Sequence, residues 1–274
     1  MTYEHISREE LLAKTKIPIR ILETEDDLYA DMADRMLRQI EQNNAQGKNT
    51  VFIVPVGPVG QYRVLAELIN ERKTDLSRVY FINMDEYLDK DGEPIPEEHP
   101  LSFSAFMDRE WYDRVGMPRE NRIFPQPGKE SDIAAAIERL GGVDIAFGGV
   151  GITGHIAFNE PPEPDEPITD EQFAMLPTRT LRLTRETRTI NAVTAASGYI
   201  DYIPHSCITV GMREILSARE LRFYMNRTWQ KGVLRKIALG PVTRFAPASF
   251  LQTHPDALLT VASYVAEPPV GQLR

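Results

Sequence analysis

Hydrophobic residues occur along this chain in two kinds of segment. Short, nearly continuous apolar runs are typical of buried strands, and apolar residues three and four positions apart are typical of amphipathic helices. The runs predict strands at residues 17–22, 50–54, 79–84, 143–147, 206–210, 221–225 and 258–261. The helical spacing predicts helices that begin near residue 26, span residues 61–71, start at an N-cap at Ser131 and follow Thr228. Pro18 favours an edge position for the first strand, because proline cannot donate to a ladder.

This alternation of strands and helices predicts one domain over residues 1–274. We expect an α/β fold with a mostly parallel, doubly wound, Rossmann-like sheet and helices on both faces. Residues 161–182 stand apart, because their first part is rich in proline and acidic residues and is too polar for a core. This segment is either a mobile lid over a site or a solvated surface insertion.

Composition narrows the classes of protein. Of 274 residues, 42% are hydrophobic and 26% are charged, which is typical of a globular domain. The net charge of -9 argues against a nucleic-acid or anionic-membrane partner, and no apolar run is long enough to predict a transmembrane helix. The first residues lack the apolar centre of a secretion signal. Cys207 is the only cysteine, which excludes an internal disulfide and fits a reducing compartment, so we expect a cytoplasmic protein.

Residues 148–161, GGVGITGHIAFNEP, are the most informative segment of the chain. Glycines are suited to a backbone that turns sharply or approaches a ligand closely. His155 and Glu160 follow the predicted strand 143–147, and Asp85 follows the predicted strand 79–84, so all three are expected at the carboxyl edge where α/β sheets bind ligands. A carboxylate and a histidine in one crevice are suited to proton abstraction next to a carbonyl. The simpler alternatives are a helix cap for Asp85 and a hydrogen-bonded buried histidine for His155.

Other chemistries fit the sequence less well. The five histidines are dispersed without the spacing of a zinc site, and no Gly-x-Ser-x-Gly motif of a serine hydrolase occurs. Residues 149–154 match the Gly-x-Gly-x-x-Gly dinucleotide fingerprint, but Pro161 argues against the long phosphate-facing helix that this fingerprint needs.

Two segments carry a resemblance to a known family. Residues 81–87, FINMDEY, and residues 148–161 resemble the two signature segments of the glucosamine-6-phosphate deaminases. The related 6-phosphogluconolactonases resemble the glycine turn and the histidine, but the continuation AFNEP is similar to the deaminase branch. Shorter segments at 98–103, 208–211, 230–231 and 251–255 resemble family segments in the same order.

The resemblance implies an aldose–ketose isomerisation coupled to loss of ammonia. It implies that Asp85 is the base that moves a proton between C2 and C1, that His155 opens the sugar ring, and that Glu160 orients His155. It further implies no metal or organic cofactor, a sugar or sugar-phosphate substrate, and a homo-oligomer. The residues that it implies contact substrate are Gly57, Glu86, Gly149, Gly151, Thr153, Gly154 and Lys231.

The chain departs from the family pattern at three places. Thr153 stands where the family has an aspartate, and a neutral hydroxyl stabilises an imidazolium less than a carboxylate does. Residues 56–60, VGPVG, stand where the family has a phosphate-binding loop similar to TGGTP, so two hydroxyls are missing and Pro58 lacks an N–H. An arginine of the family is also missing near Val193. Lys231 is the phosphate-site residue that the resemblance retains, and the arginines that are candidates to substitute for the missing groups are Arg63, Arg188 and Arg227.

These observations favour an enzyme whose specificity has shifted away from the usual phosphosugar, so we expect weak binding of glucosamine 6-phosphate. Ordinary deamination of that sugar by a rearranged pocket is a second reading. A sugar-binding sensor or pseudoenzyme on the same fold is the third, although such a protein needs no proton-transfer residues.

Overall fold

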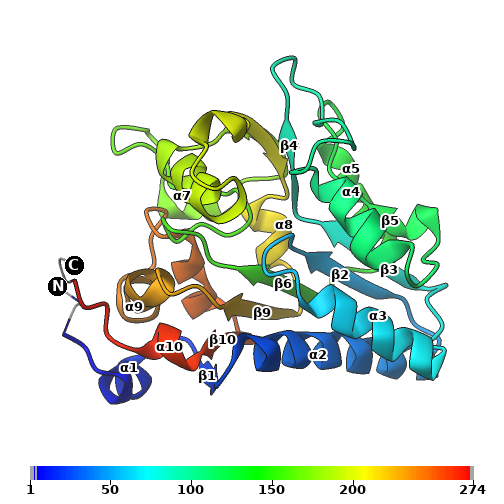
Figure 1. Cartoon of the computed structure of the whole chain (residues 1–274), viewed down its shortest axis with the longest axis horizontal. Helices are drawn as coiled ribbons and strands as arrows, with labels where there is room; N and C mark the ends of the chain where they lie inside the picture. Colours follow the sequence, from blue (N-terminus) through cyan, green and yellow to red (C-terminus); the bar gives the residue numbers. More distant parts are fainter. Residues whose placement is uncertain (1–2, 4, 272–274) are drawn as a thin grey trace.

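The structure is a computed structural model that describes residue 3 and residues 5–271 (Figure 1). Its strands are β1 (Ile19–Leu22), β2 (Thr50–Val54), β3 (Val79–Asn83), β4 (Asp85–Leu88), β5 (Arg122–Ile123), β6 (Ile145–Gly149), β7 (Arg179–Arg182), β8 (Ser206–Thr209), β9 (Glu220–Met225) and β10 (Ala257–Ala262). Its α-helices are α1 (Arg8–Lys14), α2 (Glu25–Ala45), α3 (Gln61–Arg72), α4 (Phe103–Met107), α5 (Ser131–Leu140), α6 (Asp170–Ala174), α7 (Arg185–Ala195), α8 (Met212–Leu216), α9 (Gln230–Leu239) and α10 (Ser263–Ala266). Shorter 3-10 or π-helical segments are η1 (Asp108–Tyr112), η2 (Arg119–Asn121), η3 (Ile200–Tyr202) and η4 (Pro247–Thr253).

The central sheet has seven strands in the order β1-β10-β9-β6-β2-β3-β5, and all neighbours in it are parallel. The doubly wound α/β fold predicted from the strand–helix alternation is therefore confirmed, and β1 lies at an edge as Pro18 predicts. After β2 the chain builds one half of the sheet through β3 and β5, and it then crosses to β6 for the other half. The carboxyl ends of β2 and β6 thus flank the point at which the strand order reverses, which is where open α/β sheets bind ligands.

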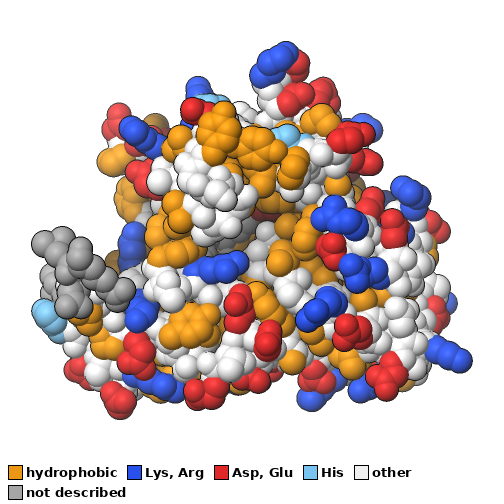
Figure 2. All heavy atoms as spheres, viewed as in Figure 1, with side chains coloured by type: hydrophobic (Ala, Val, Ile, Leu, Met, Phe, Trp, Pro, Cys, Tyr) orange, Lys and Arg blue, Asp and Glu red, His pale blue; other side chains and the backbone are white. Residues whose placement is uncertain are grey.

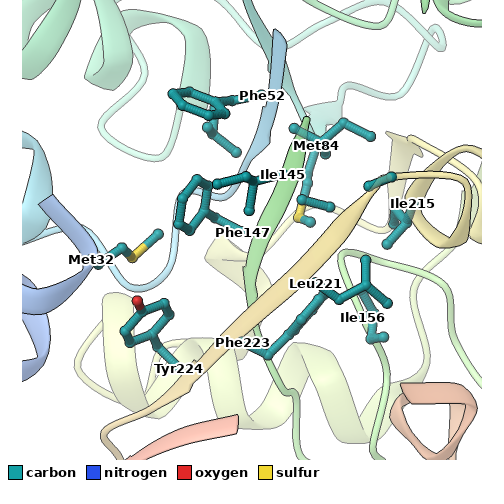
Figure 3. Packing of buried hydrophobic residues seen from close by; sticks show 14 of the residues in the cluster. Met32, Phe52, Met84, Ile145, Phe147, Ile156, Ile215, Leu221, Phe223 and Tyr224 are labelled. Carbon is teal, nitrogen blue, oxygen red and sulfur yellow. The ribbon is translucent and has the colours of Figure 1, made fainter. Parts of the chain in front are cut away.

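Apolar side chains of the sheet and its helices form one extended core (Figure 3). The α2 helix begins after a capping box formed by Thr24 and Asp27, and its buried face includes Met32. In the sheet, the Phe52 and Phe147 rings meet edge to face with centroids 5.4 Å apart. Packing of aromatic edges against faces is favourable beyond the area that it buries. The core therefore holds β2 and β6, the two strands beside the reversal point, in a fixed relation.

A second sheet, which the sequence pattern did not predict, lies above the first in Figure 1. It has the order β4-β8-β7, and both pairs are antiparallel. The chain passes into it directly from β3 through Met84, whose N–H donates to the Val54 carbonyl and whose carbonyl accepts from the Val210 N–H. Asp85 therefore lies where the two sheets join.

Several local predictions need correction. The strand predicted at 206–210 is β8, which belongs to the second sheet. Ser131 is the first residue of α5 and not its N-cap, because the cap position is Glu130 and has no side-chain hydrogen bond. The strand predicted at 143–147 is β6, which extends over Gly148 and Gly149. A Cβ on Gly148 would lie 2.4 Å from the Phe223 ring, so this glycine allows close strand packing rather than a turn.

The described helices include none with the length and apolar character needed to cross a membrane.

Candidate active site

A pocket of about 280 Å³ lies at the carboxyl ends of β2, β3, β6 and β9. Figure 2 shows this face of the molecule hollowed between the upper part, which carries α7, and the central sheet. The lining residues are Pro55, Val56, Gly57, Pro58, Val59, Met84, Asp85, Tyr87, Phe103, Gly149, Val150, Gly151, His155, Ala157, Phe158, Asn191, Thr194, Ala195, Tyr224, Asn226, Arg227, Trp229 and Gln230. The pocket thus occupies the reversal point of the sheet, and both Asp85 and His155 line it.

Asp85 is a buried carboxyl at the end of the pocket beside β3. Its side chain is only 6% exposed. Burial, with a smaller contribution from the neighbouring Glu86 carboxylate, raises the pKa of Asp85 to about 8. A carboxyl group whose pKa lies near the working pH both accepts and returns a proton readily. Its place and its pKa suit the base that the sequence predicts.

His155 and Glu160 form a buried pair in the segment after β6. The distance from His155 Nδ1 to Glu160 Oε2 is 3.2 Å. The Thr153 hydroxyl lies 2.9 Å from His155 Nδ1 and donates to Glu160 Oε2 at 3.4 Å, so its oxygen is free to accept from Nδ1–H. This arrangement favours the tautomer with the proton on Nδ1 and a lone pair on Nε2. Nε2 is then the nitrogen whose lone pair is free to accept a proton.

Glu160 is an ionised partner for His155. Burial acts to raise the pKa of Glu160, but the hydrogen bond and charge of His155, together with hydroxyls of Thr187 and Thr184, outweigh burial and lower that pKa. The carboxylate stays negative at neutral pH and orients the imidazole. Thr153 therefore bridges the two members of the pair, and the carboxylate beside His155 comes from Glu160.

Two threonines of the α7 region complete this cluster, and sequence reasoning missed them. Thr184 Oγ1 donates to Glu160 Oε1 at 3.1 Å and also caps the N-terminus of α7. Thr187 Oγ1 lies 3.3 Å from His155 Nδ1. One turn further along α7, Asn191 donates to the Tyr87 hydroxyl at 2.8 Å, and both of these residues line the pocket. The only sequence signal was a capping threonine before a weakly amphipathic stretch, and nothing in it pointed to His155.

The glycines of the site separate into two groups. Gly57, Gly149 and Gly151, for which substrate contact stays a prediction, line the pocket. A Cβ on Gly151 would lie 1.9 Å from His155 Nε2, and one on Gly149 would lie 2.7 Å from the Gly57 carbonyl oxygen. Gly154 lies outside the lining, adopts φ +88° and packs against Ala246. Gly151 is thus required because a larger residue would displace the His155 imidazole. Gly154 is required because its backbone is left-handed, a conformation that glycine adopts without strain.

Three other predicted contact residues lie outside the lining. The Thr153 hydroxyl contacts His155 Nδ1, as described above, and Thr153 does not line the pocket. The Glu86 carboxylate accepts from the N–H groups of Phe103 and Ser104, which fixes the start of α4. Lys231 lies in a second hollow with Thr228, Gly232 and the segment 267–271, and this hollow shares Trp229 with the pocket. Glu86 and Lys231 therefore do not line the pocket, and their contact with substrate stays a prediction.

The loop after β2 is apolar where it faces the pocket. Val56, Pro58 and Val59 line it, so no side-chain hydroxyl of this loop reaches a ligand. Of the arginines proposed to substitute, Arg188 donates to the carbonyl oxygens of Ile200 and Ile203, and Arg63 is exposed on α3 outside the lining. Arg227, directly after the β9 end, does line the pocket.

The segment 161–182 does not contribute to the pocket lining. Phe173 of α6 is buried, and Asp170 accepts from the Arg244 backbone N–H at 2.8 Å. Its last residues form β7, which pairs with β8. Its role as a lid stays a prediction, while α7 supplies the lining on this side of the pocket.

Comparisons with known proteins bear on this geometry. No family model matches the chain. The glucosamine-6-phosphate deaminase of Lachnoclostridium phytofermentans is 31% identical over 237 residues, which are 83% of this chain and 93% of that protein. The glucosamine-6-phosphate deaminase of Halothermothrix orenii is 32% identical over 211 residues, which are 74% of this chain and 80% of that protein.

Solved structures share the fold. A monomeric glucosamine-6-phosphate deaminase is similar with a TM-score of 0.77 at 22% identity, covering 91% of this chain and 99% of its own. The 6-phosphogluconolactonase from Plasmodium vivax is similar with a TM-score of 0.67 at 16% identity, covering 94% of this chain and 97% of its own. These identities are low, so the structures establish the fold, and the sequence matches decide between the two branches. The chain belongs to the glucosamine-6-phosphate deaminase family.

Proposed function

We propose that this protein is an amino-sugar deaminase that works by aldose–ketose proton transfer, with glucosamine 6-phosphate as the first substrate to test. The observation that carries this proposal is the buried Asp85 carboxyl, whose pKa is about 8, in the same pocket as the His155–Glu160 pair. The homologues named glucosamine-6-phosphate deaminase support it. A pure binding protein needs neither a base of raised pKa nor a histidine of fixed tautomer.

In this proposal the reaction begins with His155. Nε2 accepts the proton of the C1 hydroxyl of the closed sugar and returns a proton to the ring oxygen, which opens the ring to an aldehyde. Glu160 and the threonines that hold Nδ1 keep the imidazole in place during both transfers. Because Nδ1 is tied to Thr153 and Glu160, the exchange takes place at Nε2 alone.

Asp85 then moves the proton that isomerises the sugar. Its ionised carboxylate removes the proton from C2 of the open aldehyde, and the electron pair passes through C1 to the carbonyl oxygen. The acid that results returns a proton to C1, and the oxygen on C1 takes a proton from the nitrogen on C2, which leaves a C1 hydroxyl and an imine at C2. Water adds to that imine and ammonia departs, so the products are a ketose and ammonia. Asp85, His155, water and the amino group of the substrate account for every transferred proton, and no redox step occurs.

The test is an assay of ammonia and ketose with glucosamine 6-phosphate, glucosamine and the corresponding neutral sugars. Stoichiometric formation of ammonia and ketose supports the proposal. Binding of a sugar without either product would contradict it and would favour the sugar-binding sensor. Ketose formation from a neutral sugar without ammonia would make the protein an isomerase only.

Three broader features are also proposals. We infer a homo-oligomer in the cytoplasm, built from one domain over residues 1–274, although a solved structural neighbour is described as monomeric. Light scattering coupled to size-exclusion chromatography measures the mass of the particle. A mass of 31.1 kDa, that of one chain, would contradict the oligomer.

A further inference from the structure

Among the described residues that line the pocket, Arg227 is the one arginine, and there is no lysine. It follows Asn226 directly after β9, and its side chain is 48% exposed. Figure 2 shows Lys and Arg side chains near the lower margin of the hollow, although it does not label them. An anionic group that enters this pocket therefore has a single candidate for a direct ion pair.

The backbone of Arg227 is fixed, whereas its guanidinium is weakly engaged. Its N–H donates to Gln230 Oε1 at 2.7 Å, and Gln230 Nε2 donates to the Val150 carbonyl at 2.7 Å. This link ties Arg227 to the glycine segment that carries His155. The guanidinium has only a 4.0 Å approach to Glu25, whose carboxylate already accepts from Asn226 and Tyr29. By contrast, Arg188 donates to two carbonyl oxygens.

Arg227 and Asp85 lie toward opposite ends of the pocket. The strands β9, β6, β2 and β3 are successive neighbours, so the ends of β9 and β3 are three strand spacings, roughly 14 Å, apart. A sugar whose C1 and C2 lie at Asp85 and His155 leaves its C6 end free to extend along the row toward β9. Between the β3 end and the β9 end, the loop after β2 lines the pocket with the apolar side chains of Val56 and Val59.

Trp229 lies two residues after Arg227 and lines both this pocket and the hollow that contains Lys231. Its indole Nε1 is buried and has no hydrogen-bond partner within the described part of the chain. A buried N–H without an acceptor is destabilising.

We propose that Arg227 is the specificity-determining residue of this pocket and that it binds a phosphate ester at the far end of the sugar, in place of the hydroxyl-bearing loop that the chain lacks. This inference rests on the proposed function for the position of the reacting carbons. It predicts the opposite of the expectation that glucosamine 6-phosphate binds weakly. Charge-assisted hydrogen bonds to a planar guanidinium give affinity and geometric selection in one contact.

The experiment compares binding of glucosamine 6-phosphate and of glucosamine by titration calorimetry. The wild-type protein is expected to prefer the phosphorylated sugar by at least about tenfold. Arg227→Gln is expected to abolish most of this preference, and Arg227→Lys to keep part of it, because lysine retains the charge without the bidentate geometry. Arg63→Gln removes an exposed cation outside the lining and is the control that is expected to keep the preference, whereas Lys231→Gln tests the cation that the resemblance implies and is expected to keep the preference as well.

Two results would overturn the inference: no preference in the wild-type protein, or a preference that survives in Arg227→Gln or disappears in Lys231→Gln. Measurement of ammonia in the same samples separates this inference from the proposed function. A preference that depends on Arg227 without ammonia release supports the phosphate contact and contradicts the deaminase. Ammonia release without any preference supports the deaminase and contradicts the phosphate contact. In active protein, the Arg227→Gln change should raise KM for the phosphorylated sugar much more than it lowers kcat.

Discussion

The β6 end and the β9 end of the pocket differ in how firmly their polar side chains are held. At the β6 end, His155 and Glu160 are held by hydroxyls of Thr153, Thr184 and Thr187, which come from two separate segments of the chain. At the β9 end, the Arg227 guanidinium has one distant carboxylate, and the neighbouring loop presents valines and proline. A side chain that exchanges protons must have one geometry, whereas a side chain that receives a mobile anionic group tolerates more freedom. Under the proposed function, this contrast separates preorganised proton-transfer residues from a recognition end that the substrate completes.

The largest expected effect is at Asp85. Asp85→Asn keeps the shape of the side chain but cannot accept a proton, so kcat should fall by at least ~10²-fold, the lower range for loss of a general base. Steady-state measurement of ketose formation tests this. In the wild-type protein, kcat/KM should rise with pH as Asp85 ionises, with a limb near pH 8, where burial places its pKa. Near-normal turnover by the variant would remove Asp85 from the mechanism.

The same carboxyl should affect stability in a pH-dependent way. Burial raises the pKa of Asp85 from 3.8 to about 8, so its contribution to the free energy of unfolding is full below pH 3.8 and is lost as the pH rises toward 8. Asp85→Asn cannot ionise and should be the more stable protein at pH 9, by on the order of a few kcal/mol. Urea unfolding at pH 5 and pH 9 measures this difference. Equal stability changes in both proteins between these pH values would contradict the burial of the charge.

Gly151 tests whether the β6 end depends on its packing. Gly151→Ala would place a Cβ 1.9 Å from His155 Nε2, so the imidazole must move and kcat should fall by roughly 10- to 100-fold. Gly232→Ala is the matched control, because a Cβ there meets no atom within 4 Å. If Gly151→Ala kept normal kcat, the position of the His155 imidazole beside residue 151 would not matter for catalysis.

The smallest expected effect concerns Thr153. Thr153→Asp would add a second carboxylate beside His155, which favours the imidazolium, so the histidine-linked limb of the pH–rate profile should move upward by on the order of one pH unit. The maximal rate need not increase, because Glu160 already supplies a carboxylate. A limb that stays in place, together with normal activity of His155→Gln, would show that His155 does not transfer protons.

Much of this protein could be predicted from local sequence. Apolar runs and helical spacing located most strands of the central sheet, since those patterns express burial of one element at a time. The segments around Asp85 and residues 148–161 indicated the family that the comparisons establish. The β6 boundary was misplaced, because Gly148 and Gly149 are strand residues for a reason outside the strand: the Phe223 ring and the Gly57 carbonyl lie against them.

The tertiary structure decided what the sequence could not. The second sheet joins β4, β7 and β8 from distant parts of the chain. Which strand pairs with which cannot be predicted from the local pattern of any one of them. The contact of Thr184 and Thr187 with the His155–Glu160 pair arises only when the start of α7 folds against the segment after β6. Likewise, Lys231 and Arg227 are four residues apart, yet only Arg227 lines the pocket. Residue types and their order determine which chemistry is available, and the packing of elements determines which side chains share a cavity.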